Sequence, residues 1–169
     1  SVSVNSDGSI VAISSPASDI NGTNSGHVSI YENIAGSWTQ IGNHIHGNTG
    51  DFFGFSISIN SDGSTIVIGA QLSSNNGNGA NSGYASVYEN IGGSWIQIGS
   101  NITGNSGDFF GRSVSISSDG TKVVIGAPAN NGTSYVQIYE NIAGSWNQIN
   151  QNIYGEFYWD QAGSSVSMN

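Results

Sequence analysis

Residues 55–70 read FSISINSDGSTIVIGA, and this stretch decides the fold. Ile57 and Ile59 alternate with serines, which is the period of two that a half-buried β-strand shows. Asp62-Gly63 signals a tight turn, because glycine accepts the positive φ that such turns need. The run Ile66-Val67-Ile68 is apolar on both faces of a strand. The stretch therefore predicts two hairpin-connected strands, the second of them central in its sheet.

Two further strands follow before the pattern returns. The polar stretch 71–83 leads to a strand at 84–89, and a glycine turn leads on to a fourth strand at 94–98. A second polar stretch then reaches another aromatic pair, Phe109-Phe110. The unit is predicted to be a four-stranded antiparallel sheet, with its Trp and Phe-Phe positions filling the space between sheets.

The unit is repeated along the chain. The Asp-Gly turns are 55 and then 57 residues apart. Four motifs recur: Ser-Asp-Gly at 6–8, 61–63 and 118–120; Tyr-Glu-Asn at 31–33, 88–90 and 139–141; Gly-Ser-Trp at 36–38, 93–95 and 144–146; and Asp-Phe-Phe-Gly at 51–54 and 108–111. Four-stranded antiparallel units repeated every ~50 residues are typical of β-propeller blades. The fold class is therefore predicted to be all-β.

The repeat divides the chain into three blades and a remainder. We expect blades at residues 1–54, 55–111 and 112–163, and the first strand of a further blade at 164–169. Propellers close with about 4–8 blades. We therefore expect a piece of a larger propeller, completed by further blades of a parent chain or by other copies.

Charge and composition exclude several partner classes. The 169 residues carry a net charge of −9, and only Arg112 and Lys122 are positive. Nucleic-acid binding needs a basic footprint that neutralises phosphates, so we predict none. No apolar run approaches ~18 residues, so we expect no membrane insertion. The sequence has no Cys, which excludes disulfides and thiolate metal sites.

The joints between units resemble FG-GAP repeats, the propeller repeats of integrin α-subunits and of many surface proteins. The matching residues are Phe53-Gly54 with Ile68-Gly69-Ala70, and Phe110-Gly111 with Ile125-Gly126-Ala127-Pro128. The sequence is most similar to long secreted surface proteins of Bacteroidota-type bacteria. The resemblance implies an extracellular or cell-surface location, export by the type IX secretion route, and a non-catalytic role in adhesion.

Many FG-GAP blades hold calcium in a loop that contains several aspartates. Here the corresponding turns keep one carboxylate each, at Asp7, Asp62 and Asp119. Calcium takes six to eight oxygen ligands, usually from several carboxylates. We therefore predict hairpin turns and no cofactor, with calcium binding as the alternative.

A second set of aspartates shares one register of the repeat. Asp51, Asp108 and Asp160 each lie three residues before a glycine. A carboxylate at this point can accept backbone N–H bonds and fix the loop. It can also surround one face of the propeller with negative charge and attract cations, so these three are weak candidates for metal ligands.

The segment Glu156-Phe157-Tyr158-Trp159-Asp160 breaks the repeat pattern. Exposed aromatic side chains beside acids can stack on sugar faces, and they can equally cover an interface. Glu156, Tyr158 and Trp159 are therefore candidates for ligand contact. No catalytic residue is predicted, because the sequence lacks a Gly-x-Ser-x-Gly elbow and the other glutamates repeat in register.

Two of the histidines have a spacing that metal ligands also show. His44 and His46 are two residues apart, so on a strand they point to the same side, and a third ligand would complete a metal site. Their counterparts in the other repeats are Asn101 and Thr103, then Asn152 and Tyr154. His27 aligns with Tyr84 and is interpreted as a packed or surface strand residue. No metal site is therefore predicted here.

The favoured function is an extracellular binding or adhesion scaffold that is not an enzyme. Its variable loops at 17–25, 71–82 and 129–134 would contact another protein, because loops on a rigid frame commonly carry binding. A lectin-like propeller that binds a surface glycan is the first alternative. A structural spacer in a surface filament is the second.

Overall fold

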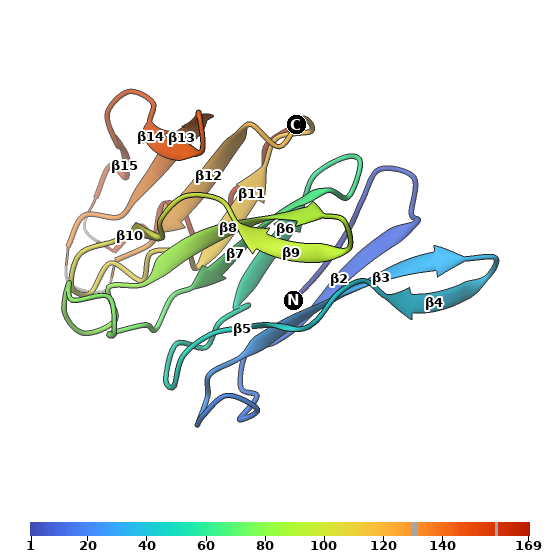
Figure 1. The fold of residues 1–169 in the computed structure, drawn as a ribbon. Helices are drawn as coiled ribbons and strands as arrows, with labels where there is room; N and C mark the ends of the chain where they lie inside the picture. The colour runs from blue at the N-terminus through green and yellow to red at the C-terminus, as the bar shows by residue number, and fades with distance from the viewer. Residues whose placement is uncertain (130–131, 158) are drawn as a thin grey trace.

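The computed structural model describes residues 1–129, 132–157 and 159–169. This part of the chain contains strands, turns and bends and no helix. It therefore has no helix with the length and apolar character needed to cross a membrane. Three antiparallel sheets follow one another in chain order, from blue through green to orange in Figure 1. The predicted all-β class with three antiparallel blades is confirmed.

Each blade contains five assigned strands. Those of the first blade are β1 (Val2–Val4), β2 (Ile10–Ser15), β3 (His27–Ile34), β4 (Ser37–Gln40) and β5 (Ile45–His46). Those of the second blade are β6 (Ser56–Ile59), β7 (Thr65–Ala70), β8 (Tyr84–Ile91), β9 (Ser94–Gln97) and β10 (Ile102–Thr103). Those of the third blade are β11 (Ser113–Ile116), β12 (Lys122–Ala127), β13 (Tyr135–Ile142), β14 (Ser145–Gln148) and β15 (Ile153–Tyr154).

The outer strand of each blade is broken into two pieces. In the first blade the order is β1-β2-β3-β4, and β5 pairs with the other end of β3. The break contains Gly42, which has a φ of +69° and approaches Trp95 of the next blade. The sequence predicted only the first piece, because the second is two residues long and lies in a polar stretch.

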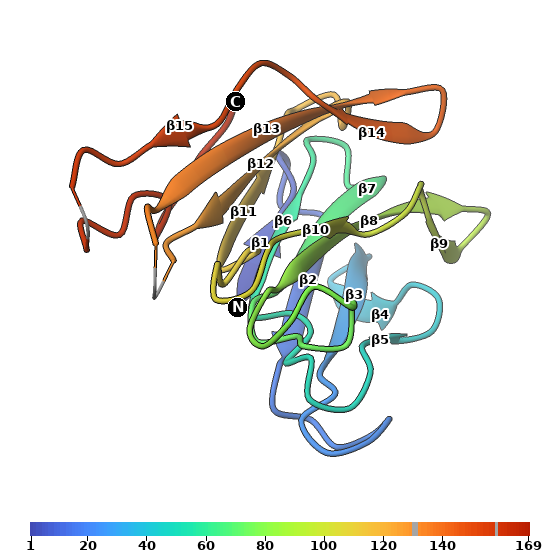
Figure 2. The ribbon, with the colours of Figure 1, turned by 90° about the vertical axis from the view of Figure 1, so that its left-hand side faces the viewer.

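Serine hydroxyls join the inner strands of neighbouring blades. The N–H of Ile59 in β6 donates to Ser3 Oγ in β1 at 3.0 Å, and the N–H of Ile116 in β11 donates to Ser58 Oγ in β6 at 3.3 Å. The alternation of serine with apolar residues therefore has two uses. The apolar residues fill the core, and the serines satisfy backbone groups where two blades meet. Figure 2 shows the outer hairpins β3–β4, β8–β9 and β13–β14 on one side of the molecule.

Residues 164–169, which we expected to begin a further blade, have no strand assigned. A strand is defined by hydrogen bonds to a neighbour, and no described segment pairs with these residues as β12 pairs with β11. Their backbone nevertheless bonds to the preceding inner strand, β11, as the inner strands of successive blades bond to each other. The N–H of Met168 donates to Ser115 Oγ at 3.1 Å, as Ile59 does to Ser3.

The hydrophobic core lies in two layers between blades. We call the side of a blade that faces the preceding blade its front and the other side its back. The first layer joins the back of the first blade to the front of the second, and the second layer repeats this one blade later. Ile66 and Ile68 of β7 enter the first layer and Val67 enters the second, so the predicted central strand is confirmed.

The repeated aromatic residues hold neighbouring blades together. Phe53 and Phe110 are fully buried, as expected for core positions. Trp95 Nε1 donates to Ile41 O of the preceding blade at 3.2 Å, and Trp146 makes the same bond one blade later at 3.0 Å. Trp38, at the same position in the first blade, is 51% exposed on the open front of that blade.

Candidate functional site

The joints between blades depend on close backbone approaches at glycine. Gly54 N–H donates to Gly69 O and Gly111 N–H donates to Gly126 O, both at 3.1 Å. A side chain on Gly111 would meet the Tyr84 carbonyl oxygen of the preceding blade. Only glycine fits between two sheets at this distance, and its φ of +83° also favours glycine. These contacts place the start of each blade against the one before it.

Asp51 lies at the centre of the joint between the first two blades. Its side chain is fully buried. Oδ2 accepts hydrogen bonds from Asn48 N at 2.9 Å, Asn48 Nδ2 at 3.2 Å and Tyr84 OH at 2.9 Å. Oδ1 accepts from Ser73 Oγ at 2.7 Å and Asn75 Nδ2 at 3.1 Å. The carboxylate therefore holds its own loop against the second blade.

Asp108 repeats this arrangement between the second and third blades. It accepts hydrogen bonds from Asn105 N at 2.8 Å and from Tyr135 OH at 2.5 Å. The proximity of each carboxylate, together with burial as the larger cause, raises the pKa of Tyr84 and of Tyr135 well above its ordinary value. Both tyrosines are therefore hydrogen-bond donors at every physiological pH.

Asp160 has the same register but an exposed position. It accepts hydrogen bonds from Ser134 Oγ at 2.5 Å and from Phe157 N and Ala162 N at 3.2 Å each. The Ser134 hydroxyl is the main cause that lowers the Asp160 pKa, and the backbone N–H groups add to it. The three aspartates lie at three separate joints, and each fixes its own loop.

The aspartates of the hairpin turns are also hydrogen-bonded within the turn. Asp7, Asp62 and Asp119 each accept a bond from the backbone N–H two residues later, at 2.8, 2.8 and 3.0 Å. Hydrogen bonding to side-chain hydroxyls, first of all that of Ser117, lowers the pKa of Asp119 to about 2. Each carboxylate closes its turn, as an Asx turn does. In the part of the chain described here, no group of three or more His, Cys, Asp or Glu side chains is placed so that it could hold a metal ion.

Asparagine side chains fasten the long loops of the second blade. Asn75 Nδ2 donates to Thr49 O at 2.8 Å, Asn76 Nδ2 to Gly83 O at 2.9 Å and Asn78 Nδ2 to Gly104 O at 2.9 Å. The loop after β7 is therefore tied both to the joint before the blade and to the joint after it. The loops after β2 and β7 and the joints before β6 and β11, together with Pro128 and Ala129 after β12, form one rim of the molecule, which we call the loop rim (Figure 1).

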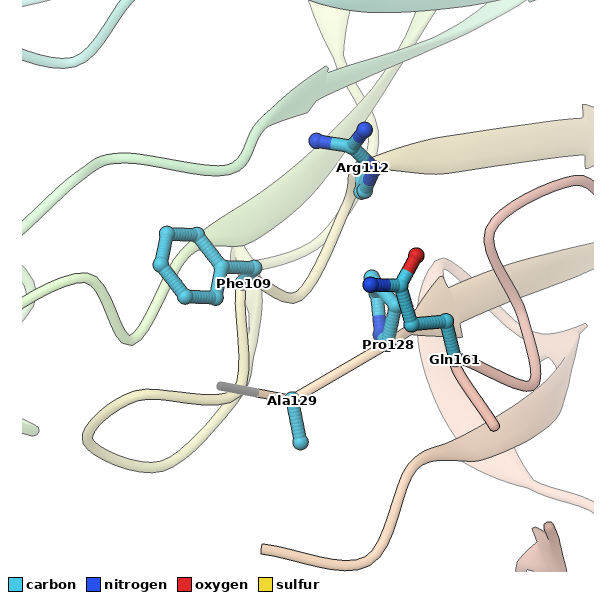
Figure 3. Close-up of a pocket in the computed structure, with 5 residues that line it drawn as sticks. All are labelled: Phe109, Arg112, Pro128, Ala129 and Gln161. Atoms are coloured by element: carbon cyan, nitrogen blue, oxygen red, sulfur yellow. The ribbon is translucent and has the colours of Figure 1, made fainter. Parts of the chain in front are cut away.

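A hollow of about 160 Å³ opens on the loop rim between the second and third blades (Figure 3). Its lining residues are Phe109, Arg112, Pro128, Ala129 and Gln161. Arg112 Nη1 donates to Gln71 Oε1 at 3.1 Å, and the guanidinium lies 5.7 Å from the centre of the Phe55 ring. The other cation of the chain, Lys122, pairs with Glu140 at 2.9 Å. Among the described residues, Arg112 is therefore the cation without a carboxylate partner.

The structure places the predicted ligand-contact segment beside this rim, after β15. Glu156 is exposed, Phe157 is 73% exposed and Trp159 is 64% exposed. Trp159 has a φ of +78° and takes the place of Gly50 and Gly107, both at +81°. Such a conformation is strained for a bulky residue. The third candidate, Tyr158, lies outside the described residues.

The comparison with protein families agrees with this geometry. A family model described as "FG-GAP repeat" matches residues 46–88 and 103–138. These two segments carry FG-GAP repeats. Each matched segment contains a glycine joint, the hairpin that follows it and the first part of the third strand of the blade. The resemblance inferred from the Phe-Gly and Gly-Ala motifs is therefore confirmed.

Solved structures support the propeller fold of the FG-GAP blades, and 28 chains match. A putative 6-phosphogluconolactonase from Bacteroides fragilis has a TM-score of 0.61 at 18% identity, over 91% of this chain and 38% of its own. TolB from Acinetobacter baumannii has a TM-score of 0.50 at 17% identity, over 87% and 31%. The tricorn protease has a TM-score of 0.51 at 12% identity, over 91% and 15%.

These similarities define the fold alone. The chain spans well under half the length of each of the three structures. At identities of 18% and below, nothing of their activities transfers to this chain. No curated protein sequence matches it.

The histidines of the first blade form a cluster that the sequence did not predict. His27 in β3 is the direct cross-strand partner of His46 in β5. The ring centroids lie 5.0 Å apart for His27 and His44, 5.8 Å for His44 and His46, and 6.1 Å for His27 and His46. The alignment of His27 with Tyr84 was correct, but the pairing of β3 with the short β5 was not expected.

Proposed function

We propose that this chain is part of a larger extracellular protein and acts as a non-catalytic binding scaffold of the adhesion kind. The loop rim contacts another protein, and the blades hold the loops in place. The observation that carries this proposal is that the repeated polar side chains bond within the fold and hold neighbouring blades together. Asp51 and Asp108 make equivalent structural bonds in successive joints, and the segments that differ between blades are the loops on one rim.

The same observation supports a role other than catalysis. The carboxylates in register fix loops and turns, and their lone pairs are occupied by hydrogen bonds within the fold. An active site needs acids, bases or nucleophiles that converge on one substrate position. The hollow at Arg112 offers one cation, one amide and apolar groups, which suits binding better than bond cleavage.

The open faces of the end blades support membership of a larger propeller. Val2, Val4, Ile13 and Trp38 are exposed on the front of the first blade, where the equivalent residues of the next two blades are in the core. Ile153 is exposed at the outer edge of the third blade. Further blades of a parent chain, or of other copies, would cover both faces. Since FG-GAP repeats are typically extracellular, they support an extracellular or cell-surface location.

A surface glycan is the second candidate ligand, on one specific observation. Phe157 and Trp159 are exposed next to Glu156 and Asp160. Aromatic faces beside hydrogen-bonding carboxylates can stack on sugar rings. This candidate predicts that Trp159→Ala removes binding, whereas the protein-binding proposal predicts that changes in the loop after β7 remove it.

Binding of the fluorescently labelled chain to the surface of cells distinguishes these functions. The proposal predicts saturable binding that is lost after protease treatment of the cells and kept after periodate oxidation of their glycans. Replacing residues 74–80 with a Gly-Ser linker should weaken binding, while a control change on the opposite rim, Asn147→Ala, should not. Periodate-sensitive binding would favour the glycan candidate. A lack of saturable binding would contradict both the protein-binding and the glycan-binding candidates, and the structural spacer would remain.

A further inference from the structure

All three histidines of the chain lie together on the first blade. Their side chains project from the front of that blade. His27 and His46 are directly opposite each other on paired strands, and residues opposite each other point to the same face. His44 bonds to Ser29, which is two residues after His27 and therefore on the same face.

We propose that His27, His44 and His46 bind one divalent transition-metal ion, of the Zn²⁺, Ni²⁺ or Cu²⁺ class. Neutral imidazole is a preferred ligand of these ions. Three imidazoles that each hold one ion at about 2.0–2.1 Å have ring centroids about 5–6 Å apart. The observed separations of 5.0, 5.8 and 6.1 Å have this size.

Ser29 prepares His44 for this role. Ser29 Oγ lies 2.6 Å from His44 Nδ1. Metal-binding histidines usually donate the N–H of one ring nitrogen to a nearby acceptor, which leaves the other nitrogen for the ion. Ser29 is that acceptor in the tautomer that carries the His44 proton on Nδ1, and this tautomer leaves Nε2 available for the ion. At the equivalent positions of the second blade, Ser86 Oγ donates to Asn101 Oδ1 at 2.8 Å.

His27 has a nitrogen that needs a partner. Its Nδ1 is buried, and the fold provides no hydrogen bond to it. A buried polar atom without a partner costs free energy that a ligand bond would recover.

As the rings stand, the three histidines could not hold a metal ion together, so the rings have to turn before all three can reach one ion. This movement is small in energy, since rotation about the bond to an aromatic ring is broad and His46 is exposed. The strand pairing that fixes the three backbones needs no change.

The proposed membership of a larger propeller suggests a fourth ligand. In the next two blades the residue at the position of His27 is a tyrosine that bonds to the aspartate of the preceding joint, Tyr84 to Asp51 at 2.9 Å and Tyr135 to Asp108 at 2.5 Å. A blade in front of the first would place its own joint aspartate beside His27. The three histidines bind the ion whether or not that blade is present.

The other blades supply matched substitutions that keep the architecture. The positions of His27, His44 and His46 are occupied by Tyr84, Asn101 and Thr103 in the second blade, in equivalent strand pairs. Each proposed ligand can therefore be replaced by the residue that the second blade has at the equivalent position. These substitutions are His27→Tyr, His44→Asn and His46→Thr. Asn101→Ala is the control, because it changes the same position in a blade without histidines.

Isothermal titration of the 169-residue chain without an affinity tag, with Zn²⁺ and separately with Ni²⁺ in a buffer that does not chelate, tests the proposal. We expect one ion per chain with micromolar or tighter affinity. Each histidine substitution should weaken binding at least tenfold, and Asn101→Ala should leave it unchanged. Excess Ca²⁺ should not compete, because a hard cation prefers oxygen ligands.

NMR of the wild-type imidazole groups provides a second test that needs no variant. Ni²⁺ at one equivalent should broaden the ring signals of all three histidines together. If no ion binds in the titration, the proposal is overturned. If the histidine variants keep the affinity of the wild type, or if only one ring signal broadens, the proposal is also overturned, and the result is an adventitious ion only.

Discussion

Asp51→Asn tests how far the joint between the first two blades depends on one buried carboxylate. The substitution keeps the size and shape of the side chain and replaces one oxygen by an NH₂ donor. All the groups around Asp51 are donors: the backbone N–H and side-chain amide of Asn48, the amide of Asn75, and the hydroxyls of Ser73 and Tyr84.

The orientation of the new amide sets the size of the effect. At the place of Oδ2 its NH₂ group would face the backbone N–H of Asn48, which cannot accept a bond. At the place of Oδ1 it faces Ser73, whose hydroxyl can reverse, and Asn75 Nδ2, which is held by Thr49 O at 2.8 Å. The second orientation is the better one, and it still opposes the Nδ2 donor of Asn75.

The remaining bonds are also weakened. Hydrogen bonds to a charged group contribute about 1.5–3 kcal/mol each and those between neutral groups about 0.5–1.5 kcal/mol. Three bonds at the place of Oδ2 thus lose about 1 kcal/mol each, partly offset because a neutral amide is less costly to bury. We expect the free energy of unfolding to fall by about 2–4 kcal/mol.

Urea unfolding followed by tryptophan fluorescence and by circular dichroism measures this change. Asp160→Asn is the matched control, because Asp160 has the same register and is exposed, so its substitution should shift the midpoint far less. An unchanged midpoint for Asp51→Asn, or an equal shift for both variants, would refute the assignment of Asp51 as a structural group of the joint.

Three further perturbations test the same description of the fold. Trp95→Phe removes the bond to Ile41 O and should cost about 1 kcal/mol in urea unfolding, whereas Trp38→Phe on the open front should have no measurable effect. Because burial holds the His27 pKa below its ordinary 6.5, the unfolded chain binds more protons as the pH falls through that value, so the metal-free chain should lose stability as the pH falls below 6.5. His27→Tyr should flatten this pH dependence, and an unchanged slope of unfolding free energy against pH would contradict the lowered pKa of His27. Gly126→Ala places a methyl group against the backbone carbonyl of Gly163. It should lower the thermal midpoint, which corresponds to a loss of about 1–3 kcal/mol in the free energy of unfolding. An unchanged midpoint would contradict the close approach of the two backbones at this joint.

The local pattern was enough to predict the strands and turns of each blade. The alternation of Ile57 and Ile59 with serine, and the turn at Asp62-Gly63, act over a few residues, so they can be read without knowing what lies nearby. The broken outer strand was missed for the same reason. Its second piece, such as Ile102–Thr103, is too short to leave a pattern and exists because β8 offers it a partner.

The sequence by itself determined the repeat, the antiparallel blades and the FG-GAP joints, because strand period, turn chemistry and the need for glycine are local properties. Only the tertiary structure decided what the repeated residues do. Asp51 and Asp160 share one register, yet the second blade buries Asp51 while Asp160 stays exposed. The pairing of β3 with β5 likewise brings His27 to His44 and His46, because contacts between distant residues depend on which strands meet and in which register.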